Sequence, residues 1–255
     1  MYRYFDLVVR WNHSWLTDES GILTVPVGYR NNTGNSMRPA DERQYAWSFV
    51  GNITSSRFAM AKALETFAPH FITYTGGLAK GNTKNLSKAE FDAVLENTVF
   101  APCPMGNATI ETTRVFESLE LGCIPLVELR LTLDYYGNLL GPNPIPAFRS
   151  WPEARRFAEH LYQDKPSLLA KQAEVMDWWR TYKPAMCAQA REAIIGPSRS
   201  ADLQHYAAKL RNRFAVIHEP LRIIEILRHQ TVGSLLRRLS RPAGPLARIV
   251  ANLRG

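Results

Sequence analysis

Short apolar runs alternate with amphipathic stretches between residues 44 and 128 of the chain. The apolar runs predict buried strands, and the intervening stretches carry the three-to-four-residue spacing of helices. In order, the segments read YAWSFVG, RFAMAKALETF, HFITYT, SKAEFDAVLEN, TVFAPCP, IETTRVFESLELG and CIPLVE. A strand–helix alternation with continuously apolar strands is typical of a parallel sheet covered on both faces. We therefore predict an α/β fold, a Rossmann-like parallel sheet with helices on both faces, over residues 44–150.

The flanking regions follow different patterns. Residues 1–43 contain two further strand candidates, LVVRW and LTVPVGYR, which could extend the same sheet. Beyond a loop rich in Gly, Asn and Pro, helical patterns begin near Pro152, Pro166, Ser200 and Glu219. We predict a start of the fold in 1–43, a helical region in 151–230, and a basic tail in 231–255.

The composition limits the classes of protein to which the chain can belong. With 255 residues and 45% hydrophobic content, the chain can bury one sizeable core. It contains neither a run of about 18 apolar residues nor the apolar segment of a signal peptide. The expected location is therefore the cytoplasm. The three cysteines form no CxxC pair, so they favour buried thiols over a disulfide framework or a zinc site.

The chain has a net charge of +8, and its basic residues are most concentrated near the C-terminus. There, residues 219–255 mix Leu, Ile and Val with Arg at helical spacing. Such a segment suits an anionic membrane surface at the inner face of the membrane, and it equally suits a solvated helix with a frayed tail. Nucleic acid is not an expected partner, because no RNA- or DNA-binding module is present. A dehydrogenase is disfavoured because no G-x-G-x-x-G follows the first clear strand.

The segment 102–128 carries the most chemical information, because it reads strand, glycine-containing loop, helix, glycine, strand. A loop and a helix N-terminus after a parallel strand form an anion site suited to a diphosphate. On the predicted helix from about Ile110 to Leu121, the residues Glu111, Arg114, Glu117 and Ser118 fall opposite the apolar stripe. The Arg114 guanidinium could hold phosphate oxygens and the Glu117 carboxylate could accept ribose hydroxyls. By spacing alone, an ordinary surface ion pair is the better explanation of the two residues.

The same segment resembles the hallmark of exostosin-type glycosyltransferases and of the ribitol xylosyltransferase C-terminal domain. The shared elements are Cys-Pro-x-Gly at 103–106, Arg-x-x-Glu at 114–117 and Gly-Cys-Ile-Pro at 122–125. VPVGYR and SFVGNITSSR are similar to two further elements of those families, in the same order. The resemblance covers roughly residues 7–160. It implies the nucleotide-sugar-binding half of a GT-B enzyme, with the acceptor-binding half largely missing or supplied by a partner chain that completes the cleft.

The resemblance also implies a set of donor-binding residues. Arg57 would contact the donor diphosphate together with Arg114. The complete predicted set is Arg114, Glu117, Arg57, Gly106, Asn107, Thr109 and Glu111. No Asp-x-Asp motif occurs, so we expect neither a metal nor a cofactor, and basic side chains and helix dipoles would neutralise the leaving group. No catalytic base is assigned.

Two functional hypotheses follow. The first is a metal-independent hexosyl- or pentosyltransferase of exostosin type that moves a sugar from a nucleotide-diphosphate donor, expected to be a UDP-sugar, to a glycan or glycoconjugate acceptor. The second is a non-catalytic nucleotide-sugar-binding or assembly subunit that requires a partner domain. A parallel α/β fold alone does not separate them, so the case depends on the site.

Overall fold

The computed structural model describes residues 7–10, 22–29, 37–53, 55–77, 86–106, 109–130 and 134–195. Several sequence predictions lie outside these residues. They are the site residue Asn107, the helix starts near Ser200 and Glu219, the membrane-surface segment 219–255 and the basic tail 231–255. These remain predictions from the sequence.

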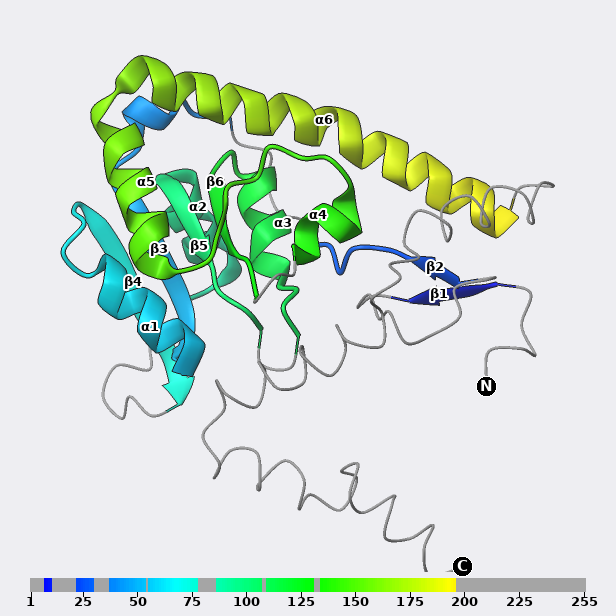
Figure 1. Cartoon of the computed structure of the whole chain (residues 1–255), viewed down its shortest axis with the longest axis horizontal. Helices are drawn as coiled ribbons and strands as arrows, with labels where there is room; N and C mark the ends of the chain where they lie inside the picture. The colour runs from blue at the N-terminus through cyan, green and yellow to red at the C-terminus, as the bar shows by residue number, and fades with distance from the viewer. Residues whose placement is uncertain are drawn as a thin grey trace, which may run out of the picture.

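A five-stranded, fully parallel sheet forms the centre of the molecule, in the strand order β4-β3-β5-β6-β7 (Figure 1). Its strands are β3 (Tyr45–Ile53), β4 (His70–Gly77), β5 (Thr98–Cys103), β6 (Ile124–Glu128) and β7 (Ala147–Phe148). The connecting helices are α1 (Ser55–Leu64), α2 (Lys88–Glu96), α3 (Thr113–Glu120) and α4 (Tyr135–Leu140). The predicted α/β, Rossmann-like fold is confirmed.

Two apolar cores separate the sheet from its helices. On one face, α2, α3 and α4 pack around Val115, Phe116 and Leu119. On the other face, α1 packs over Trp47, Phe49 and neighbouring residues. Strand β5 is buried along its whole length. This two-sided burial explains why the strands read as continuous apolar runs instead of alternating.

Two helices complete the C-terminal part of the described chain, as predicted. Helix α5 (Trp151–Gln163) is capped by Ser150, whose side chain accepts the Glu153 N–H, and has a proline in its first turn. Helix α6 (Lys165–Ile195) then runs across the top of the view in Figure 1 from the α5 side to the α3 side. It continues through Pro184 in its interior, a residue that usually ends or kinks a helix.

The N-terminal strands do not extend the sheet. Strands β1 (Val8–Arg10) and β2 (Ile22–Thr24) pair with each other in a separate parallel ladder, beside the main sheet in Figure 1. The following segment is tied to the α3 and α6 side: the Val27 N–H donates to Glu111, and the Lys183 ammonium lies over the Tyr29 ring. These contacts hold the segment away from the sheet edges.

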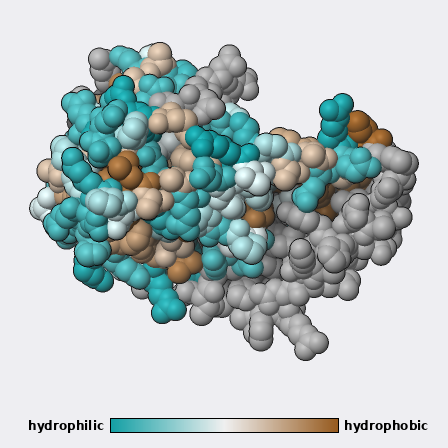
Figure 2. Space-filling view, turned by 90° about the horizontal axis from the view of Figure 1, so that it is seen from above, coloured by the Kyte–Doolittle hydropathy of each residue, from teal (hydrophilic) through white to brown (hydrophobic). Residues whose placement is uncertain are grey.

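None of the described helices is long and apolar enough to cross a membrane. The face seen from above is mostly hydrophilic, with apolar residues in separated patches (Figure 2).

The cysteines agree with the prediction only in part. Cys103 and Cys123 are buried as predicted, and burial raises their thiol pKa values to about 12 and about 11. Cys187 is exposed on α6, so the prediction of a buried thiol was wrong there.

Candidate functional site

The strand order places a topological switch point between β3 and β5. The helix that follows β3 covers one face of the sheet, and the helix that follows β5 covers the other. A crevice therefore opens outside the carboxyl ends of these two strands, where open parallel sheets bind their ligands. The residues that end β3 and begin α1 and α3 surround this crevice.

Helix α3 differs from its predicted form in start and exposure. It begins at Thr113, because the Thr112 side chain caps it by accepting the Arg114 N–H at 3.5 Å. The face predicted to lie away from the core is buried: Glu117 is 7% exposed and Ser118 is 0% exposed. This face lies against the sheet, where the Ser118 hydroxyl is 4.0 Å from the Cys103 thiol of β5. Helix α6 packs on another side of α3, where Trp179 contacts the Phe116 ring and donates to Glu120 at 2.9 Å.

Arg114 reaches from α3 to the carboxyl end of β3. Its Nη2 donates to the Val50 carbonyl at 2.6 Å, and its guanidinium lies 4.3 Å from the centroid of the Phe49 ring. Burial lowers the pKa of Arg114, partly offset by the nearby Cys103 and Glu117. A β-carbon on Gly51 would lie only 3.1 Å from this Nη2. The backbone of β3 thus fixes the guanidinium at the crevice, and glycine leaves room for it.

Arg57, in the first turns of α1, lies close to Arg114. Its Nη1 donates to the Asn52 carbonyl at 2.9 Å, while its Nε is buried without a hydrogen-bond acceptor. Burial and the neighbouring positive charge of Arg114 lower the pKa of Arg57 to about 10. In the described part of the chain, neither arginine has an ion-pair partner. Two guanidiniums held together in this way form a site suited to an anion.

A cavity of about 440 Å³ adjoins Arg114. Its lining includes Thr113 and Glu117 of α3, Phe91 of α2 and Thr75 of β4. The structure thus brings Arg114 and Glu117 into one pocket, as the sequence predicted. The two residues lie within a partly enclosed cavity and not on an open helix surface, so the surface ion pair considered as an alternative does not describe them.

The remaining predicted site residues shape the loop between β5 and α3. A β-carbon on Gly106 would lie 3.0 Å from the Glu111 carbonyl oxygen and 3.1 Å from that of Thr109, so the tight turn requires glycine. The Thr109 hydroxyl donates to the Glu111 carbonyl. The Glu111 side chain accepts the Val27 N–H at 2.6 Å and the Tyr135 hydroxyl at 2.9 Å. These contacts give Glu111 a structural role in joining three segments.

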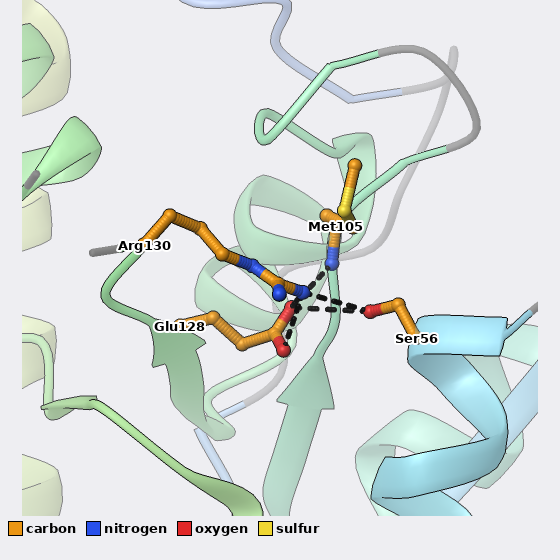
Figure 3. A network of polar contacts seen from close by, with 4 residues as sticks. All are labelled: Ser56, Met105, Glu128 and Arg130. Carbon is orange, nitrogen blue, oxygen red and sulfur yellow. Dashed lines mark hydrogen bonds and ion pairs between the residues drawn. The ribbon is translucent and has the colours of Figure 1, made fainter. Parts of the chain in front are cut away.

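A polar network beside the crevice was not predicted (Figure 3). The Glu128 carboxylate, at the end of β6, accepts two bonds from Arg130 at 2.6 and 2.7 Å and one from the Met105 N–H at 2.9 Å. Ser56, at the start of α1, accepts from Arg130 at 2.9 Å and donates to Glu128 at 3.4 Å. The network therefore braces the β5 loop and α1 against β6. The feature of the sequence that could have indicated this network is the acidic residue at the end of a buried strand.

Metal ligation has no support in the described part of the chain, since no three His, Cys, Asp or Glu side chains gather there in a way that could hold an ion. Arg114 and Lys88 are the cations that line the cavity, and Lys88 pairs with Asp92.

Comparison with known proteins gives weak likenesses. No family model matches the sequence, and no curated protein matches it. An α1,3-fucosyltransferase crystal structure is similar with a TM-score of 0.47 and 14% identity over 68% of this chain and 60% of that chain. A second, of α1,3-fucosyltransferase with GDP-fucose, gives a TM-score of 0.40 and 15% identity over 58% of this chain and 48% of that one. The chain thus spans less than two thirds of either protein, and likenesses this weak assign no family or activity.

Proposed function

We propose that this chain is the nucleotide-sugar-binding part of a GT-B glycosyltransferase, with a UDP-sugar as donor and a glycan or glycoconjugate as acceptor. The observation that carries the proposal is the convergence of Arg57 and Arg114, without ion-pair partners in the described structure, beside the pocket that holds Glu117. The sequence resemblance to exostosin-type enzymes assigns the same residues to the donor. Partly buried cations without ion-pair partners favour an anionic ligand, because the ligand offsets their desolvation.

Each side chain has a defined task in this proposal. The two guanidiniums hold the diphosphate oxygens, and the Glu117 carboxylate accepts hydroxyl groups of the ribose. When the bond between the sugar's anomeric carbon and the diphosphate oxygen breaks, its electron pair stays on the diphosphate. Arg57 and Arg114 stabilise that growing negative charge. The acceptor oxygen bonds to the anomeric carbon, and its proton passes to a base that lies outside the residues named here.

The pocket has a suitable size for part of such a donor. Small-molecule sites occupy roughly 300 to 1,000 Å³, and the cavity beside Arg114 measures about 440 Å³. Phe91 and Thr75 line the cavity together with Glu117. A nucleoside in this pocket would place its ribose at Glu117 and its phosphates toward Arg114 and Arg57.

A non-catalytic nucleotide-sugar-binding or assembly subunit is the second candidate. The described residues hold a single Rossmann-like sheet and a separate two-stranded ladder, whereas a GT-B cleft lies between two such domains. A partner domain or chain would then supply the acceptor side. The peripheral membrane location proposed for 219–255 rests on sequence alone.

Calorimetric titration with UDP, GDP, ADP and NAD tests the nucleotide site. We expect UDP to bind best, and we expect Arg114→Ala and Glu117→Ala to weaken that binding by about a hundredfold and tenfold, respectively, because charge-assisted hydrogen bonds are lost. Arg180→Ala is the matched control, since Arg180 is exposed on α6 and pairs with Asp177. Unchanged UDP affinity in a folded Arg114→Ala protein contradicts the site. Nucleotide binding without sugar transfer in the presence of acceptors favours the non-catalytic candidate.

A further inference from the structure

A second, larger hollow lies between α1 and α5, with a volume of about 890 Å³. We call it the α1–α5 groove. It begins at Ser56 and Glu128, at the carboxyl edge of the sheet, and follows α1 as far as Ala63. Seven further residues of helix correspond to about 10 Å along the axis. The groove is thus long enough for an extended ligand.

The groove carries an excess of positive charge. Its two acidic side chains are neutralised within it, because Glu128 pairs with Arg130 and Glu159 pairs with Arg155 at 2.7 Å. Three more cations also line it: Lys62, Arg149 and Arg156. All three are exposed, and none has an ion-pair partner in the described part of the chain. A ligand with several negative charges complements this lining.

Some of the lining is fixed before any ligand binds. Arg155 is held by Glu159 and also donates to the Ala63 carbonyl at 3.3 Å. Trp151, which is 5% exposed, adds a buried aromatic side chain to the lining.

The groove adjoins the candidate donor site. Ser56, which opens the groove, directly precedes Arg57, and the Ser56 hydroxyl belongs to the network that also holds the Met105 N–H of the β5 loop (Figure 3). A chain lying along the groove therefore has one end beside the two arginines of the donor site.

We propose that the α1–α5 groove binds an acidic oligosaccharide, namely the stretch of the acceptor glycan that precedes its reactive end. The inference rests on the proposed transferase function. Carboxylate, sulfate or phosphate groups on the sugars meet Lys62, Arg149 and Arg156. The lining offers no exposed aromatic side chain on which bases could stack, because Trp151 is buried. Single-stranded nucleic acid therefore fits the groove less well.

The test measures binding of a tetrasaccharide of galacturonic acid to the full chain, with maltotetraose as the neutral probe and an eight-nucleotide single-stranded DNA as the competing polyanion. We expect the acidic tetrasaccharide to bind in a salt-sensitive manner and the neutral one not to bind. The double variant Arg149→Ala/Arg156→Ala should weaken this binding by about thirtyfold or more. The matched control is Arg180→Ala/Arg191→Ala, which removes the same charge from the exposed side of α6. Thermal unfolding confirms that both variants fold.

The outcomes separate the two proposals. Equal tetrasaccharide binding by the groove variant and the control overturns the groove, as does tighter binding of the DNA that is lost in the groove variant. If the tetrasaccharide binds as expected but no nucleotide binds to the unmodified protein, the donor site fails while the groove stands as a glycan site. If nucleotide binds but the tetrasaccharide does not, only the groove proposal fails.

Discussion

Arginine side chains at two neighbouring parts of one sheet edge differ in how their charge is compensated. At the end of β6, Arg130 lies against both carboxylate oxygens of Glu128, so its charge is neutralised within the fold. At the end of β3, Arg57 and Arg114 lie together, and neither has an ion-pair partner in the described structure. The charge of Arg130 is compensated within the fold, whereas the charges of Arg57 and Arg114 are compensated only when an anion binds. Incomplete charge compensation is what distinguishes the candidate site from its structural support.

The largest expected effect concerns the brace. Glu128→Gln removes the negative partner of Arg130, whose side chain is only 7% exposed. Breaking a buried pair in this way should lower the free energy of unfolding by about 3 kcal/mol. Urea denaturation measures the change. The control is Glu159→Gln, whose pair with Arg155 is about one-third exposed and contributes roughly 0.3 to 0.5 kcal/mol. Equal losses in the two variants would show that the network does not act as a brace.

The second prediction tests whether the backbone of β3 positions the Arg114 guanidinium. Gly51→Ala places a β-carbon 3.1 Å from Arg114 Nη2, so the guanidinium must shift. We expect nucleotide affinity to fall by about tenfold while stability changes by less than about 1 kcal/mol. Gly141→Ala is the control: its φ is 72° with open space around it, so it should cost about 1 kcal/mol of stability without affecting affinity. Calorimetry measures the nucleotide affinity of both variants, and urea denaturation measures their stability.

The smallest effect tests whether the arginine pair is strained without ligand. Arg57→Met removes a partly buried cation beside Arg114, so stability should rise by roughly 0.5 to 1 kcal/mol although nucleotide affinity falls. Burial and Arg114 lower the pKa of Arg57 to about 10 in the folded protein, so below that pH the folded protein keeps the charge at a cost in stability. Above that pH the folded protein releases the proton, and the stability advantage of the variant should shrink as pH rises from about 10 toward the ordinary value of 12.5. A variant less stable than the parent at neutral pH would indicate that Arg57 mainly supports the fold.

The sequence supplied most of the fold because its signals are local. Every strand and helix between Tyr45 and Glu128 was predicted within a few residues, since continuous apolar runs and capping residues such as Ser87 act over short distances. The site was predicted partly by resemblance: Arg114 and Glu117 do share a pocket. The exposure of α3 was predicted wrongly, because nothing in its own sequence shows that its polar face lies against β3 and β5, where Arg114 reaches Val50 and Ser118 lies 4.0 Å from Cys103.

By itself, the sequence determined the order of the elements, the two-sided burial of the sheet and the presence of arginine and glycine at the crevice, because propensity, periodicity and turn chemistry are properties of short segments. The tertiary structure alone decided which of those charges are compensated. Glu111 and Glu128 are both acidic residues near the site, yet contacts with Val27, Tyr135 and Arg130 occupy them within the fold. Compensation depends on atoms brought within hydrogen-bonding distance across the sheet, and only packing sets those distances.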